Sequence, residues 1–126
     1  MPFVRIDIPS TFTAQRIDAI SDVVYEAMHI TMNVPADDRF QMIASPRRVF
    51  DREYLSISRS DDTVFIEITL RSGRTPDVKR AFYAALASGL EERAQIAKSD
   101  VFIVLHENEK IDWSFGNGIA QYEPDS

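Results

Sequence analysis

The feature that most constrains the fold of this chain is an internal repeat. A shift of 62 positions, which brings Phe3 onto Phe65, aligns one half of the sequence with the other without a gap. Identical pairs include Phe3/Phe65, Ile6/Ile68, Thr13/Thr75, Asp38/Asp100 and Phe40/Phe102. These identities are few, but the order of apolar and polar residues also agrees along both halves. The sequence therefore predicts a duplicated βαβ unit, covering about 2–44 and 63–106.

Each half predicts a strand, a helix and a second strand. Apolar runs place the strands at about 2–8, 38–44, 63–70 and 100–106. The helices are expected at about 12–32 and 76–96. Thr75 as the N-cap and Pro76 as the first helical residue mark the start of the second helix. We expect the stretch 45–60 to be a loop with a short extended piece near Tyr54–Ile57.

The repeat also constrains how these elements are arranged. Because βαβ crossovers are right-handed, two units related by a pseudo-twofold axis give a four-stranded mixed sheet with both helices on one face. The sequence thus predicts a single α/β (α+β) domain over residues 1–126. The other face has no cover within the chain, although DVFIVLH (100–106) is apolar on both sides. Since a strand buried on both faces needs a second layer, we expect a closed homo-oligomer.

Composition argues against several classes of function. The chain has no cysteine, which excludes disulfides, thiol nucleophiles and cysteine-based metal sites. A net charge of -6 argues against nucleic acid as a partner. The two histidines, His29 and His106, are far apart, and no P-loop or GxGxxG motif is present, so we expect neither a metal site nor a bound nucleotide. Without a signal-like or long apolar segment, we expect a cytoplasmic protein with no membrane partner.

Chemically capable residues converge at one edge of the predicted sheet. The start of the first strand lies beside the end of the third in the pseudo-twofold arrangement. The start of the second strand and the segment after the fourth reach the same edge. The second helix also begins there, and a helix N-terminus favours an anion. The residues gathered at this edge are Pro2, Asp38, Arg71, Arg74, Trp113 and Phe115.

Each of these residues also has a purely structural interpretation. A proline suits the start of a strand because it has no N–H to donate. Asp38 could begin a strand, as its counterpart Asp100 is expected to do. Loop arginines are commonly solvated, Trp113 and Phe115 could belong to a core or an interface, and His29 is expected to be exposed. Their convergence at one edge nevertheless favours a functional site.

Four motifs together resemble a known family. They are VPADDRFQ (34–41), the helix start GRT (73–75), AFYAAL (81–86) and DWSFGNGIAQ (112–121). With the proline after Met1, they are similar to the tautomerase superfamily, and within it to the malonate semialdehyde decarboxylase-like branch. The resemblance covers essentially the whole chain. It implies a homotrimer, no cofactor and a small oxo acid as the substrate.

The resemblance also implies a role for each residue at the edge. Pro2 would be the catalytic proline, Asp38 the carboxylate, Arg71 and Arg74 the binders of the substrate carboxylate, and Trp113 and Phe115 the pocket walls.

Two features depart from the decarboxylase pattern. The arginines are three positions apart rather than two, and this spacing, with His29, is similar to the cis-3-chloroacrylic acid dehalogenase branch. The dehalogenases also use a glutamate and a tyrosine, and Phe115 and Val104 stand at about those positions. We therefore expect no dehalogenation and leave decarboxylation open.

The chemistry available to Pro2 depends on a free amine, which requires that Met1 be removed. An α-amino group has an ordinary pKa of about 8, which apolar neighbours and arginines lower and Asp38 raises. A neutral amine would act as a general base in the tautomerisation of a 2-oxo acid. A cationic amine, which the presence of Asp38 favours, would polarise a carbonyl for decarboxylation of a 3-oxo acid, or for hydration with Asp38 activating water. An iminium with the carbonyl is a further route.

A second hypothesis belongs to a different class. If Met1 is retained, Pro2 is an amide and none of these mechanisms operates. The alternative is then a non-catalytic homotrimeric interaction protein that retains the fold.

Overall fold

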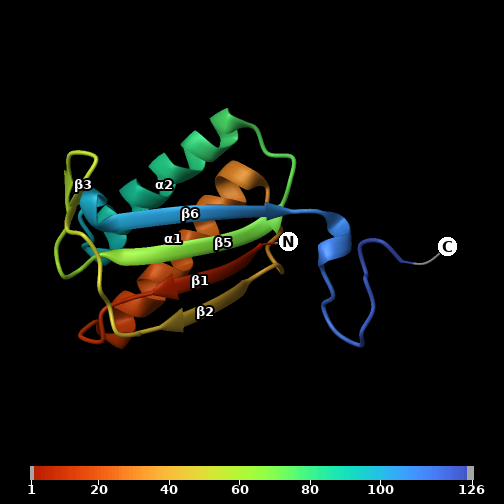
Figure 1. Ribbon diagram of the computed structural model, residues 1–126, viewed down its shortest axis with the longest axis horizontal. Helices are drawn as coiled ribbons and strands as arrows, with labels where there is room; N and C mark the ends of the chain where they lie inside the picture. The colour runs from red at the N-terminus through yellow and green to blue at the C-terminus, as the bar shows by residue number, and fades with distance from the viewer. Residues whose placement is uncertain (1, 125–126) are drawn as a thin grey trace.

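The computed structural model describes residues 2–124, and its main elements form one sheet with two helices behind it (Figure 1). The main strands are β1 (Phe3–Asp7), β2 (Phe40–Ala44), β5 (Val64–Arg71) and β6 (Val101–Asn108). The helices are α1 (Ala14–Met32) and α2 (Pro76–Ala94). Shorter elements are β3 (Glu53–Tyr54), β4 (Ile57–Ser58) and the 3-10 turns η1 (Lys98–Asp100) and η2 (Lys110–Asp112). The predicted fold class is confirmed.

The sheet has the pseudo-twofold order that the repeat predicts. Its strands follow one another as β2-β1-β5-β6. β1 runs parallel to β2 and antiparallel to β5, and β5 runs parallel to β6. Phe3 lies beside Phe40 on one side and Thr69 on the other. The starts of β1 and β2 and the ends of β5 and β6 therefore meet at one edge of the sheet.

The two helices begin and end in the same way. The hydroxyls of Thr13 and Thr75 each accept a hydrogen bond from the backbone N–H three residues further on, at 3.2 and 3.3 Å. This N-cap satisfies a donor that would otherwise be unpaired. Both helices end at a left-handed residue, Asn33 with φ 56° and Gln95 with φ 55°. The expected helices at 12–32 and 76–96 are thus correct to within two residues at each end.

The core lies between the helices and the covered face of the sheet. Alternate residues of β1 and β5 point into it, and Val4, Ile6 and Ile68 are fully buried. α1 and α2 pack closely because α2 has a glycine at their contact: a Cβ at Gly89 would lie 2.7 Å from Cγ1 of Val23. Neither helix in the described part of the chain is long and apolar enough to cross a bilayer.

The strand boundaries lie within two residues of the prediction, and the two strands expected to begin at an aspartate begin later. β2 begins at Phe40 rather than at Asp38, whose N–H donates instead to the carbonyl of Pro35 at 3.1 Å. β6 begins at Val101, so that Asp100 ends the turn before it. In both places a backbone turn precedes the strand, and an aspartate fits such turns better than a sheet ladder.

Asp100 is a buried structural carboxylate. It accepts hydrogen bonds from the N–H and hydroxyl of Ser60, at 2.7 and 2.6 Å, and from the hydroxyl of Thr63 at 3.0 Å. Burial alone would raise its pKa, but these donors hold the pKa of Asp100 below its ordinary value. Asp100 therefore fixes the turn that leads into β5.

The stretch 45–60 holds a small hairpin rather than a single extended piece. β3 and β4 pair with each other, and the tip between them consists of Leu55 and Ser56, with φ 53° and 60°. The short extended segment expected near Tyr54–Ile57 is therefore two segments on either side of a turn. The tip is apolar and open to solvent, since Leu55 is 76% exposed.

The face of the sheet opposite the helices is open and partly apolar. Phe3, Phe40, Met42 and Phe102 are all exposed there, with Met42 at 55%. On the same face, Nε2 of His106 lies 3.0 Å from a carboxylate oxygen of Glu67 on the neighbouring strand. A monomer rarely leaves such an apolar surface uncovered.

Candidate active site

A cavity of about 390 Å³ opens where the end of α1, the end of β5 and the C-terminal segment meet. It is lined by Met32, Asn33, Val34, Pro35, Asp37, Asp38, Arg71, Arg74 and Tyr122. Three residues that the sequence singled out, Asp38, Arg71 and Arg74, are thus brought together. Asp38 is more than 30 positions from the two arginines in the sequence, so the fold brings the carboxylate and the guanidinium groups together.

The two arginines are fixed by the turn between β5 and α2. Arg71 is the last residue of β5, and Gly73 with φ 121° allows the chain to turn toward the helix. Nη1 of Arg74 donates to the carbonyl of Arg71 at 2.8 Å. Nε of Arg74 is buried, and no acceptor among residues 2–124 bonds to it. Burial, and then the charge of Arg71, lower the pKa of Arg74. A cation with an unused buried donor suits an anionic ligand.

Asp38 is the acidic group of this cavity. The residue is only 4% exposed. Burial, supported by the charge of Asp37, raises the pKa of Asp38, and the guanidinium of Arg74 acts in the opposite direction. A carboxylate with a raised pKa is a better proton acceptor than an exposed aspartate, so Asp38 can exchange a proton with a bound molecule or water.

An aromatic wall stands beside the charged groups. The rings of Trp113 and Phe115 are stacked with centroids 5.6 Å apart, and Phe115 also stacks on Phe40 at 6.4 Å. The indole N–H of Trp113 donates to Oδ1 of Asn108 at 2.7 Å, which fixes the ring at the end of β6. The sequence predicted Trp113 and Phe115 as pocket walls, but neither is among the residues that line the cavity, and Phe115 contacts the lining residue Tyr122.

The segment DWSFGNG folds the chain back toward the cavity. Gly116, Asn117 and Gly118 all have positive φ, at 142°, 59° and 66°, which explains these residue types. The side chain of Gln121 closes the loop, because it accepts from the N–H of Phe115 and donates to the carbonyl of Gly116, both at 2.9 Å. The residue after Gln121 is thereby brought to the arginines.

That residue is Tyr122, which the sequence analysis did not identify. Its ring lies edge-on to Phe115 at 5.1 Å, and the guanidinium of Arg71 lies 5.5 Å from its centroid. Burial and the nearby charge of Asp38 raise the pKa of Tyr122, so the phenol stays protonated at neutral pH. The available signal was an aromatic residue soon after a glycine-rich turn, but only the folded loop shows where it points.

Pro2 is buried directly before β1. Since Phe3 pairs with Phe40 and Thr69, the register places Pro2 at the same edge as Asp38 and the end of β5. The expected removal of Met1 concerns a residue outside the described ones. His29 is exposed, as expected, and is not among the residues that line the cavity.

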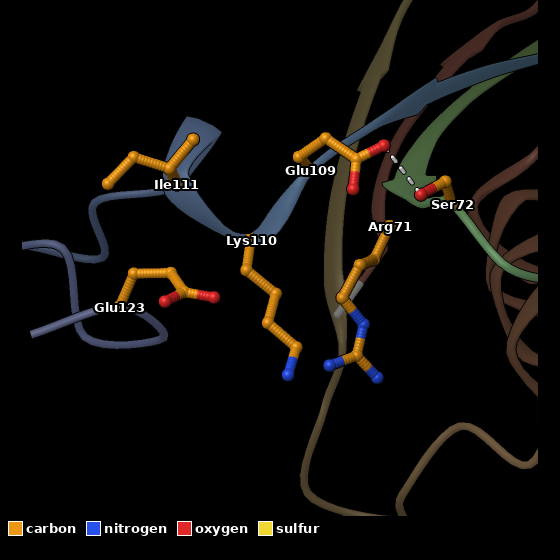
Figure 2. Close-up of a pocket in the computed structure, with 6 residues that line it drawn as sticks. All are labelled: Arg71, Ser72, Glu109, Lys110, Ile111 and Glu123. Carbon is orange, nitrogen blue, oxygen red and sulfur yellow. Dashed lines mark hydrogen bonds between the residues drawn. The ribbon is translucent and has the colours of Figure 1, made fainter.

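Arg71 also borders a second hollow, of about 730 Å³, beyond the ends of β5 and β6 (Figure 2). Its other lining residues are Ser72, Glu109, Lys110, Ile111 and Glu123. The hydroxyl of Ser72 donates to Oε1 of Glu109 at 2.8 Å, which ties the two strand ends together. In the part of the chain that the structure describes, no group of three His, Cys, Asp or Glu side chains could hold a metal ion.

Comparison with known proteins defines the family. The family model described as "Tautomerase enzyme" matches residues 38–116. The probable tautomerase YusQ of Bacillus subtilis (strain 168) is 38% identical over 124 residues, which are 96% of this chain and 98% of that protein. This chain therefore belongs to the tautomerase family.

Solved structures agree with this assignment and with the predicted branch. The crystal structure of FG41 malonate semialdehyde decarboxylase inhibited by 3-bromopropiolate is 36% identical with a TM-score of 0.88, covering 95% of this chain and 93% of that one. A second malonate semialdehyde decarboxylase, described with decarboxylase and hydratase activities, is 31% identical with a TM-score of 0.87, covering 95% of each chain. The resemblance to the malonate semialdehyde decarboxylase-like branch is confirmed.

Proposed function

We propose that this chain is a cofactor-free enzyme that acts on small oxo acids through the amine of Pro2. The observation that carries the proposal is the shared cavity of Asp38, Arg71 and Arg74, at the sheet edge where the register puts Pro2. The cavity combines two cations, a buried carboxylate and an adjacent aromatic wall. A small acid with a carbonyl group matches all three.

The two arginines would hold the carboxylate of the substrate. Arg74 has a buried Nε to donate, and it is hydrogen-bonded to the carbonyl of Arg71 at the end of β5. A guanidinium binds a carboxylate through two parallel hydrogen bonds, which fixes the direction of the rest of the molecule. The phenol of Tyr122 would lie near the same group, and Trp113 and Phe115 would shield the carbonyl from water.

Tautomerisation needs only a proton carrier at Pro2. A neutral amine removes the enol proton of a 2-oxo acid while the carbon-carbon double bond takes up a proton at carbon 3, so the proton returned balances the one removed. Apolar surroundings and the two arginines favour this neutral form. General-base catalysis of this kind contributes roughly 10²–10⁴-fold.

Decarboxylation and hydration use the cationic amine instead. With Pro2 protonated and hydrogen-bonded to the carbonyl of a 3-oxo acid, the bond to the carboxyl carbon breaks, carbon dioxide leaves, and the electron pair passes into the enol, which then takes a proton at carbon. In hydration, Asp38 takes a proton from water as the water oxygen bonds to the carbonyl carbon. The π electron pair of the carbonyl moves to its oxygen, which takes a proton from Pro2, and the proton on Asp38 then restores the cationic amine. The raised pKa of Asp38 suits this step.

The proposal is tested by assaying the enol of phenylpyruvate and malonate semialdehyde side by side, with protein whose intact mass shows that Met1 is absent. We expect turnover of at least one of them well above the uncatalysed rate. The ratio of the two rates then assigns tautomerase or decarboxylase activity. No turnover of either by a folded chain that begins at Pro2 would contradict the proposal and favour the interaction protein.

We further propose a homotrimer that covers the open face of the sheet. Exposed apolar residues of β2 and β6, such as Met42 and Phe102, support burial there. Light scattering at micromolar concentration should give three times the mass of one chain. The Phe102→Asp variant should instead have the mass of a single chain. Ile30→Asp, at a position 75% exposed on α1, serves as the control and should leave the trimer intact. A stable wild-type monomer would refute this assembly.

A further inference from the structure

The segment that carries Asp38 is fastened along the outside of α1. We call residues 33–39 the Asp38 strap. We propose that Tyr25 and His29 are positioning residues that hold the buried carboxylate of Asp38 in place through this strap. The proposal rests on the proposed function for the importance of Asp38, but the contacts that carry it do not involve the substrate.

His29 and Tyr25 hold the first half of the strap. Nδ1 of His29 lies 2.7 Å from the carbonyl oxygen of Val34, and the hydroxyl of Tyr25 donates to the carbonyl of Pro35 at 3.4 Å. The two rings, one helical turn apart, are stacked with centroids 6.1 Å apart and planes 13° apart. Two neighbouring carbonyls of the strap are therefore bound by one aromatic pair.

Arg39 holds the other end of the strap. Its Nη2 donates to Oδ1 of Asp22 at 2.8 Å and to the hydroxyl of Ser21 at 2.6 Å. Its guanidinium lies 5.2 Å from the centroid of the Tyr25 ring, within the range of a cation–π contact. Tyr25 thus contacts the strap on both sides of Asp38.

The order of these contacts follows the helix. The strap runs antiparallel to α1. Asp22, Tyr25 and His29 follow one another along the helix, and their partners are Arg39, Pro35 and Val34 in that order. The strap also contains a tight turn, in which the N–H of Asp38 donates to the carbonyl of Pro35 at 3.1 Å. A displacement of Val34 or Pro35 would therefore move the carboxylate of Asp38 directly.

The geometry separates this role from a catalytic one for His29. Its ring contacts a backbone carbonyl, which can only accept, so Nδ1 must carry the hydrogen. Both the imidazolium and one neutral tautomer have that hydrogen, so the bond does not require a particular charge. His29 then serves as a hydrogen-bond donor in a fixed position. An asparagine, whose amide nitrogen can occupy the position of Nδ1, should be able to fulfil the same role.

The test compares His29→Ala, His29→Asn and Tyr25→Phe with Tyr83→Phe, an exposed helical tyrosine of α2, as the matched control. The first readout is amide hydrogen exchange at Val34 and Asp38, and the second is the carboxyl pKa of Asp38 by NMR titration. We expect His29→Ala to speed exchange in the strap about tenfold, the scale of one lost hydrogen bond, and to bring the pKa of Asp38 down toward its ordinary value. His29→Asn should restore both.

Activity supplies the third readout. The acid limb of the rate profile in His29→Ala should follow the pKa of Asp38 downward, and kcat should fall more than KM rises. Unchanged exchange and unchanged pKa in His29→Ala, or a failure of His29→Asn to restore them, would overturn the proposal. If Asp38→Asn keeps full activity, the proposed role of Asp38 in catalysis is wrong, whereas exchange and titration still decide whether the strap is held by His29.

Discussion

Replacing Pro2 with alanine is expected to lower turnover by about 10²–10⁴-fold, the range attributed to a positioned general acid or base, while the chain stays folded. The variant keeps an amine at the N-terminus but loses the secondary amine and its fixed ring. Both the basicity and the direction of the lone pair change, so the rate should fall even though the residue is small. If Pro2 only starts β1, alanine adds an N–H at a position that needs no bond, and the rate should not change.

The matched control is Pro9→Ala, a second proline just beyond the other end of β1. It should leave the rate unchanged, because Pro9 lies at the opposite edge of the sheet. The rate of the wild type plotted against pH should show a group with an amine-like pKa, and this pKa should be displaced in Pro2→Ala. Equal rates and equal profiles in protein of confirmed mass would leave Pro2 as a strand start.

Removing the guanidinium of Arg74 is expected to lower turnover by roughly 10²-fold or more, the scale for losing a charge-assisted contact made in the transition state. Arg74 is partly buried, and its Nε–H has no acceptor among residues 2–124, so this donor is available to a bound carboxylate. Arg74→Lys should recover little of the loss, because an ammonium group cannot make two parallel bonds to a carboxylate. The measurement is kcat/KM on whichever oxo acid is turned over.

Arg80→Ala is the control for this experiment. Arg80 lies on α2, shortly after the turn that carries Arg74, but it is exposed and paired with Asp77 at 2.7 Å, so its loss should have no effect on the rate. Arg71→Ala should also be impaired, through the carboxylate contact and through the ring of Tyr122. Wild-type kinetics in both Arg71→Ala and Arg74→Ala would show that the arginines do not bind the substrate.

The sequence predicted the fold well because the repeat and the local signals agree. The caps at Thr13 and Thr75 match across the repeat, and both helices begin one residue later. The place of β1 between a parallel β2 and an antiparallel β5 follows from right-handed crossovers and the pseudo-twofold axis. These features depend on short-range chemistry and on chain topology, which the sequence expresses directly.

The site was harder to predict because equivalent residues have different surroundings. Asp38 and Asp100 occupy the same place in the repeat, and both precede a strand. Asp100 accepts three hydrogen bonds from Ser60 and Thr63, which lower its pKa, whereas burial raises the pKa of Asp38 in the cavity. The difference comes from segments distant in the sequence, so no local pattern reports it.

Two further residues show the same limit. His29 has a dehalogenase-like position in the sequence, but its ring bonds to the carbonyl of Val34. Tyr122 lines the cavity because the loop through Gly116 and Gly118 turns back, which the glycines permit but do not direct. Side-chain direction depends on tertiary contacts, and these are absent from any single motif.

The most direct test of the central claim compares two proteins that differ only ahead of Pro2. One begins at Pro2, as shown by its intact mass, and the other carries one additional alanine that blocks the amine but keeps the proline ring and β1. Turnover of the oxo acid is measured for both, with light scattering to show the same assembly. We predict turnover by the chain with the free amine and loss of that turnover in the extended chain. Equal rates in the two proteins would contradict catalysis by the amine of Pro2.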